Sequence, residues 1–228
     1  DEKDLLAFCA ENFESTVVLL NSAVPIEMGF IDNPAYHIDA AMWIGHPGEA
    51  GMHGVADILK GNVNPSGHLV DTYAYDLSTN PTFWSANDQA YTNVESASSG
   101  GGQGGPGGPG GGNSIGSGNK YYQYNEGIYV GYRYFDKYRV DVSYPFGFGL
   151  SYTGFTYSKP RYLRTEQGYE FSCTVTNTGK IPGKEVVQLY IAAPGKTMVK
   201  PQKELKAFAK TKILAPGELS LIHISEPT

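Results

Sequence analysis

The chain has 228 residues, of which 40% are hydrophobic and 13% aromatic, a composition typical of globular proteins. Its formal net charge is -6 and its 17 basic residues do not gather into one stripe, so nucleic acid is excluded as an expected partner. No run approaches the roughly 20 apolar residues of a membrane-spanning helix, so no membrane partner is expected. The length predicts two units with separate cores.

The first part of the chain has the pattern of an α/β unit. Apolar residues among charges predict a short helix over residues 4–12, followed by a buried strand over residues 15–20. A second apolar strand over residues 40–44 is followed by helical spacing over residues 49–59. Apolar strands that alternate with helices indicate a sheet covered on both faces. We therefore predict an α/β unit over residues 1–95.

The middle of the chain has two segments of unusual composition. Residues 96–120 are almost entirely Gly, Ser, Pro, Gln and Asn, and this composition predicts a disordered insertion. Residues 121–153 are dense in Tyr and Phe and are interrupted by glycines. Aromatic side chains at this density need a surface to pack against, so we predict an interdomain wrapping segment.

The last part of the chain has the pattern of a β-sandwich. Strand-like alternation occurs over residues 169–176, 185–192 and 204–213. A sandwich of this kind commonly has about seven strands, and about four or five are predicted here, so residues 154–219 are expected to form a partial domain. Residues 220–228 do not continue the alternation, and we predict that they are a non-native tail.

The two cysteines and the N-terminus bear on the cellular context. Cys9 and Cys173 fall in different predicted units, so both are expected to be unpaired, small, buried apolar residues. The sequence starts at Asp1 without a signal peptide, which predicts an interior start and a fragment. Localisation therefore stays open.

Four segments, taken together and in this order, resemble family 3 glycoside hydrolases. They are residues 43–51 (WIGHPGEAG), 61–69 (GNVNPSGHL), 124–134 (YNEGIYVGYRY) and 144–152 (YPFGFGLSY). The segments 175–179 (VTNTG) and 183–190 (GKEVVQLY) also resemble the fibronectin type III-like domain that closes many of these enzymes. The resemblance covers nearly the whole chain.

This resemblance implies both a fold and an activity. The fold would be α/β plus all-β, with the C-terminal part of an α/β sandwich domain followed by a partial fibronectin type III-like, immunoglobulin-like β-sandwich. The activity would be that of a retaining β-glycosidase, most similar to β-glucosidases, acting on β-linked oligosaccharides without a cofactor. In the family the nucleophilic Asp belongs to an N-terminal barrel domain and the acid/base Glu precedes the helix that opens this chain. The missing barrel is thus an implied partner.

We accordingly predict no catalytic residue within the chain. Retaining glycosidases need two carboxyl groups that flank the scissile bond. The acidic residues Asp71, Asp76, Glu126 and Asp136 have no spacing that fixes any two of them opposite one another.

Trp43, His46 and Glu49 are the substrate-adjacent candidates. They surround the loop at residues 45–48, which follows a predicted strand. Ligands of open α/β sheets bind outside the carboxyl ends of strands, and an aromatic ring there can stack on a sugar. A structural role competes for Glu49, because a carboxylate in the first turn of a helix is favoured by the helix dipole. His46 and His53 lack a third ligand, so no metal site is predicted.

Two alternatives to a β-glucosidase stay open at this point. One is a β-xylosidase or N-acetylglucosaminidase of the same family, because the barrel residues that would select the sugar are not in the chain. The other is a noncatalytic carbohydrate-binding or scaffold module built from the α/β unit and the sandwich.

Overall fold

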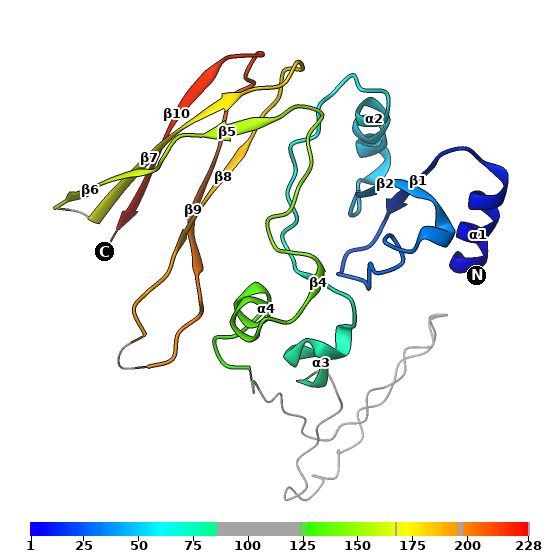
Figure 1. Ribbon diagram of the computed structural model, residues 1–228, viewed down its shortest axis with the longest axis horizontal. Helices are drawn as coiled ribbons and strands as arrows, with labels where there is room; N and C mark the ends of the chain where they lie inside the picture. The colour runs from blue at the N-terminus through cyan, green and yellow to red at the C-terminus, as the bar shows by residue number, and fades with distance from the viewer. Residues whose placement is uncertain (86–123, 125, 167, 196–197, 228) are drawn as a thin grey trace, which may run out of the picture.

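The computed structural model describes residues 1–85, 124, 126–166, 168–195 and 198–227. Figure 1 shows an α/β unit that contains the N-terminus on one side and a β-sandwich that contains the C-terminus on the other, with extended segments running between them. The predicted disordered insertion over residues 96–120 lies outside the described residues.

The described part of the α/β unit alternates helices with strands. Its elements are α1 (Glu2–Asn12), β1 (Thr16–Leu20), the 3-10 helix η1 (Pro34–Tyr36), β2 (Ile38–Trp43), α2 (Gly48–Leu59), β3 (Tyr73–Ala74), the 3-10 helix η2 (Leu77–Thr79) and α3 (Pro81–Ser85). A capping box starts α1, in which the Asp1 side chain accepts from the Asp4 amide and the Asp4 side chain accepts from Asp1. Strands β1 and β2 pair in parallel, as expected for an α/β unit.

The sheet formed by β1 and β2 is covered on one face. Leu20 is buried and packs with Met28 and Tyr73 in the core of the unit. On the opposite face of β1, Val17 and Leu19 are 48% and 37% exposed. The prediction that both faces are covered is therefore not met within the described residues.

The tyrosine-rich segment is partly helical. It contains α4 (Tyr132–Tyr138) and β4 (Val142–Tyr144), and β4 pairs antiparallel with β3 of the α/β unit. Phe135 of α4 is buried, whereas Tyr138 is exposed. Tyr132 of α4 stacks on Phe146, which follows β4, with ring centroids 4.8 Å apart. It also meets the ring of Tyr190 of the sandwich edge-on, with centroids 5.9 Å apart. The segment thus contacts both units.

The sandwich consists of two sheets of unequal width. Its strands are β5 (Phe155–Tyr157), β6 (Arg161–Thr165), β7 (Gly168–Asn177), β8 (Val186–Ile191), β9 (Glu204–Lys210) and β10 (Leu219–Pro227). β7 lies at the centre of the wide sheet and pairs antiparallel with β5, β6 and β10, whereas β8 and β9 form the narrow sheet. Val175, Val187 and Leu214 belong to the core between the sheets.

Two sequence-based predictions about the sandwich need correction. The described residues of the sandwich form six strands rather than four or five, and β6 is one that the sequence pattern did not indicate. The pattern of residues 220–228 was also misjudged: β10 pairs with β7 residue by residue, and Ile222 and Ile224 are buried. Leu221 is apolar although it is 57% exposed on the outer face. The sequence therefore shows no regular alternation of apolar and polar residues at this strand. Whether these residues are native stays a prediction.

The α/β unit and the sandwich are joined at a junction formed by residues 61–69 and 145–154. Leu69 donates from its amide to the Phe148 carbonyl at 2.7 Å and accepts from the Gly147 amide at 2.8 Å. Asn64 accepts from Ser151 Oγ and the Tyr152 amide. Its side-chain nitrogen donates to the Pro182 carbonyl of the sandwich at 3.1 Å. Asn64 is thus a physical tie between the units.

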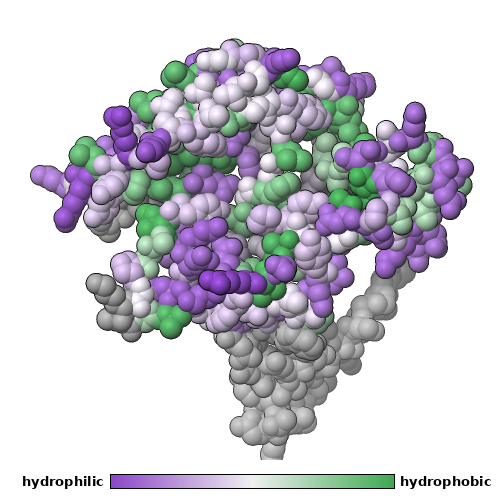
Figure 2. Space-filling view, in the orientation of Figure 1, coloured by the Kyte–Doolittle hydropathy of each residue, from purple (hydrophilic) through white to green (hydrophobic). Residues whose placement is uncertain are grey.

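The surface shows no single dominant apolar area on the face drawn in Figure 2, where hydrophobic residues form small groups among hydrophilic ones. Among the described helices, none is long and apolar enough to cross a membrane.

Cys9 and Cys173 are both free and partly buried.

Candidate functional site

The loop after β2 lies beside the end of β1. Because the two strands are parallel, their carboxyl ends meet at one edge of the sheet. The indole Nε1 of Trp43 donates to the Ser22 carbonyl at 2.8 Å, and His46 Nδ1 lies 3.2 Å from Asn21 Oδ1. The edge therefore brings polar groups from both strand ends together, as ligand sites of open α/β sheets do.

Glycine makes this loop possible. Gly45 is buried and has a φ of +58°, a conformation that side chains with a Cβ rarely adopt. An added Cβ at Gly45 would lie 3.4 Å from the Trp43 ring. The ring therefore rests against the backbone of the loop, and 37% of Trp43 is left exposed.

Glu49 lies one turn further along. It is exposed in the first turn of α2, where its charge faces the positive end of the helix dipole. No hydrogen bond joins Trp43, His46 and Glu49 to one another within the described residues, so the structure places them around one loop without linking them directly. Sequence reasoning missed Asn21 and Ser22, although they follow β1 as the loop follows β2 and the same strand-end rule would have found them.

Three of the acidic residues considered in the sequence analysis, Asp76, Asp136 and Glu126, have contrasting environments. Hydrogen bonds from the Ser78 side chain and then from the Ser78 amide, which is 2.8 Å from Asp76 Oδ1, lower the pKa of Asp76. Asp136 pairs with Lys203 at 3.2 Å. Glu126 is 8% exposed, and its Oε2 atom has no hydrogen-bond partner in the described part of the chain. No group of three or more His, Cys, Asp or Glu residues that could hold a metal occurs among the described residues.

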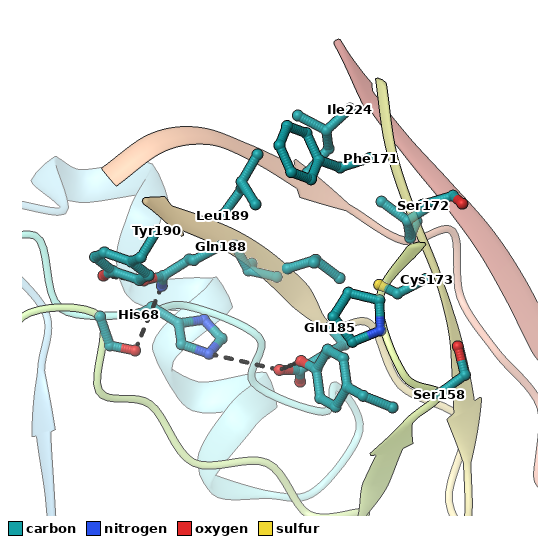
Figure 3. Close-up of a pocket in the computed structure, with 16 residues that line it drawn as sticks. His68, Ser158, Phe171, Ser172, Cys173, Glu185, Gln188, Leu189, Tyr190 and Ile224 are labelled. Atoms are coloured by element: carbon teal, nitrogen blue, oxygen red, sulfur yellow. Dashed lines mark hydrogen bonds and ion pairs between the residues drawn. The ribbon is translucent and has the colours of Figure 1, made fainter. Parts of the chain in front are cut away.

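A cavity lies between the sandwich and residues of the junction, His68 and Gly147. The cavity has a volume of about 610 Å3. In Figure 3, Phe171, Leu189 and Ile224 lie together at one end of it, and His68 and Glu185 are joined at the other. His68 Nε2 is 3.9 Å from Glu185 Oε1, which also accepts from the Tyr157 hydroxyl at 2.6 Å. Burial, followed by the neighbouring Glu185 carboxylate, strongly raises the pKa of Tyr157. The cavity is thus apolar at one end and polar at the other.

Comparison with known families identifies the larger unit. The family model of the glycosyl hydrolase family 3 C-terminal domain matches residues 1–152, which include the strand-end loop at residues 45–48 and most of the junction. The chain belongs to glycosyl hydrolase family 3. The model of the fibronectin type III-like domain matches residues 185–225, which cover most of the sandwich strands from β8 onward. The resemblance inferred from the sequence motifs is confirmed.

Individual family 3 members are similar over almost the whole chain. A β-glucosidase of Ruminococcus albus is 38% identical over 224 residues, covering 98% of this chain and 20% of that protein. A β-glucosidase of Rhizobium radiobacter is 34% identical over 219 residues, covering 95% of this chain and 23% of that protein. The chain therefore spans about a fifth of the length of these relatives.

Solved family 3 structures share the arrangement of the chain. β-Glucosidase 3B from Thermotoga neapolitana in complex with α-D-glucose matches with a TM-score of 0.80 and 33% identity, over 99% of this chain and 28% of that one. A β-glucosidase from Paenibacillus barengoltzii matches with a TM-score of 0.81 and 34% identity, over 99% of this chain and 22% of that one. The predicted fold class, α/β plus a β-sandwich, is confirmed.

Proposed function

We propose that the complete protein is a retaining β-glucosidase that hydrolyses β-linked oligosaccharides. One observation carries this proposal: relatives named β-glucosidase are 34–38% identical to the chain over at least 92% of its length. The described residues add a strand-end loop with an exposed indole, which suits contact with a sugar. Because the relatives are much longer, the activity is proposed for the complete protein.

The catalytic pair is proposed to lie outside the 228 residues, on a barrel domain and on the missing part of the α/β domain. Retention requires a nucleophile and an acid/base whose carboxyl groups are roughly 5 Å apart. In the described residues, Asp136, Glu204 and Glu218 pair with lysine or arginine side chains. Ion-paired carboxylates on the surface fit structural roles better than attack on an anomeric carbon.

Hydrolysis of an aryl β-glucoside tests whether the catalytic pair lies outside the 228 residues. The complete protein is expected to turn over the substrate and to release β-glucose first, because two inversions give net retention. The purified 228-residue chain is expected to show no turnover above a mock purification.

Turnover by the chain alone would place a catalytic pair within residues 1–228 and contradict the proposal. Faster turnover of an aryl β-xyloside or N-acetyl-β-glucosaminide by the complete protein would favour the alternative family activities. A folded complete protein that binds cellobiose but hydrolyses none of these substrates would favour a noncatalytic binding module.

The strand-end loop is proposed to contact the substrate through Trp43, with His46 and Glu49 beside it. In the complete enzyme, Trp43→Ala is expected to raise KM for cellobiose about fivefold and to change kcat less than twofold, because a stacked ring binds ground state and transition state alike. Steady-state kinetics with cellobiose check this result.

Two further variants separate substrate contact from loop support. Trp43→Phe keeps an aromatic ring but cannot donate to the Ser22 carbonyl, so its KM should stay close to that of the wild type. Met52→Ala, at a 46% exposed position of α2, is the matched surface control. Equal KM increases for both Trp43 variants would show that the indole only supports the loop.

A further inference from the structure

The end of β1 holds the loop after β2 through its backbone and through a side chain. The Leu20 carbonyl accepts from the Ile44 amide at 3.0 Å, which extends the pairing of the two neighbouring strands (Figure 1). The next residue, Asn21, places its Oδ1 atom 3.2 Å from His46 Nδ1. The imidazole of His46 is thus tied to a side chain 25 positions earlier in the chain.

Ser22 shapes the turn that follows Asn21. The Ser22 hydroxyl donates to the Val24 carbonyl at 2.7 Å, and the Val24 amide lies 3.3 Å from the same hydroxyl oxygen. A serine that bonds the backbone two residues further on closes a local turn. The Ser22 carbonyl also accepts from the Trp43 indole. Asn21 therefore lies between a paired strand and a closed turn, and both fix its backbone.

The contact with Asn21 decides which nitrogen of His46 carries the proton. In a neutral imidazole one ring nitrogen donates and the other accepts. The amide oxygen of Asn21 can only accept, so His46 Nδ1 is the donor in this contact. Nε2 is then an acceptor. His46 is exposed, and in the described part of the chain no other residue bonds its ring.

A sugar carries the groups that match this loop. Each sugar hydroxyl can donate one hydrogen bond, and the apolar face of the sugar ring can stack on an aromatic side chain. Trp43 and His46 lie close together in the sequence, on either side of Gly45, and Trp43 is 37% exposed. The same edge of the sheet thus presents an aromatic surface and an acceptor that can receive a hydroxyl hydrogen.

We propose that Asn21 is a positioning residue that holds His46 in its Nδ1–H form, so that His46 Nε2 accepts a hydrogen bond from a hydroxyl of the bound sugar. This inference rests on the proposed β-glucosidase function and adds a source of specificity to it. A sugar that lacks the donating hydroxyl would leave Nε2 without a partner and would bind less well. A bound sugar would also exclude water from the exposed contact between Asn21 and His46 and strengthen it.

Nuclear magnetic resonance measures the form of His46 without any need for enzyme activity. Ring nitrogen shifts of the nitrogen-15 histidine-labelled chain are recorded at about pH 8, where an ordinary imidazole is neutral. His46 is expected to be mainly Nδ1–H in the wild type. In Asn21→Ala it is expected to be mainly Nε2–H, the form that free imidazole side chains favour in water. His46→Gln assigns the signal, because it removes only that one.

Two controls separate the contact from the shape of the loop. Ser22→Ala loses the hydroxyl that closes the turn but keeps the amide oxygen of Asn21, so His46 should stay mainly Nδ1–H. His53 is exposed on α2, and no hydrogen bond to its ring occurs among the described residues, so it serves as the internal reference for the Nε2–H form.

Steady-state kinetics of the complete protein test the role in binding. Asn21→Ala is expected to raise KM for cellobiose about threefold and to change kcat less than twofold. Asn21→Asp keeps an acceptor oxygen and is expected to restore KM. In a His46→Ala background, Asn21→Ala is expected to have no further effect, because Asn21 acts through His46.

The outcomes distinguish this inference from the proposed function. Mainly Nε2–H His46 in the wild type, or an Asn21→Ala effect on KM of equal size with and without His46, would overturn the inference. A complete wild-type protein that hydrolyses no β-glycoside would refute the proposed function, and the ring nitrogen shifts would still decide whether Asn21 positions His46.

Discussion

Replacement of Asn177 by alanine is expected to lower the free energy of unfolding by about 3 kcal/mol, because buried polar groups would lose their partners. Asn177 has no exposed surface. Its side-chain nitrogen donates to the Ile181 carbonyl at 2.9 Å and to the Leu214 carbonyl at 2.8 Å. Its side-chain oxygen accepts from Thr153 Oγ1 and from the Gly179 amide. The side-chain amide thereby joins the turn at residues 177–181 to Thr153 and to Leu214.

Urea unfolding of the chain, followed by circular dichroism, checks this prediction. Asn177→Asp is expected to destabilise at least as much as Asn177→Ala, because it keeps the acceptor but replaces the donor with a buried carboxylate beside two carbonyls. Gln202→Ala removes an exposed amide and should change stability by less than about 0.5 kcal/mol. A loss below about 1 kcal/mol for Asn177→Ala would mean that water replaces the lost partners.

Replacement of Gly149 by alanine is expected to destabilise the chain by about 2–3 kcal/mol, because it overpacks the junction between the two units. A Cβ at position 149 would lie 2.5 Å from the Gly67 carbonyl oxygen and 2.9 Å from the His68 ring. Hydrogen bonds hold this stretch of backbone in place, because two residues after Gly67 the amide and the carbonyl of Leu69 bond to residues 148 and 147. The segments can therefore relieve the clash only by separating.

Gly54→Ala is the matched control with the opposite expected sign. Gly54 lies inside α2, and a Cβ there would meet nothing within 4 Å. Alanine in an exposed helix interior should stabilise by about 0.5–1 kcal/mol relative to glycine. Unfolding midpoints of the two variants and of the wild type decide the matter, and a Gly149→Ala midpoint equal to that of Gly54→Ala would contradict the close approach of the two segments.

The elements that could be predicted are those whose periodicity is a property of the local sequence. β1 is apolar from Val17 to Leu20, β2 is apolar from Ala40 to Trp43, and α2 has helical spacing, so their boundaries were found within about two residues. α4 was not predicted, because the aromatic residues of 132–138 favour strands and only packing of Phe135 decides for a helix. β6 was missed because its residues are mostly polar and exposed, and pairing with β7 alone makes it a strand.

In the candidate site, too, some residues could be predicted from the sequence and some contacts could not. The strand-end rule predicts that Trp43 and His46 lie at the carboxyl edge of the sheet, where open α/β sheets bind ligands, because that rule depends only on the order of elements along the chain. Which strands pair with β8 depends on how the sheets assemble, which the local pattern of β8 does not record; in the described residues it pairs with β9. The contact between His68 and Glu185 likewise depends on the junction, where Asn64 bonds a residue 118 positions away.

The tie made by Asn64 limits how separable the two units are. Residues 61–69 belong to the matched α/β domain in sequence, yet Asn64 and Ser66 bond the sandwich through Pro182 and Lys210. A sandwich transplanted from another family member at the boundary near residue 153 would therefore meet a loop shaped for a different neighbour. Recombination between relatives should preserve the junction only when residues 61–69 travel with the sandwich they contact.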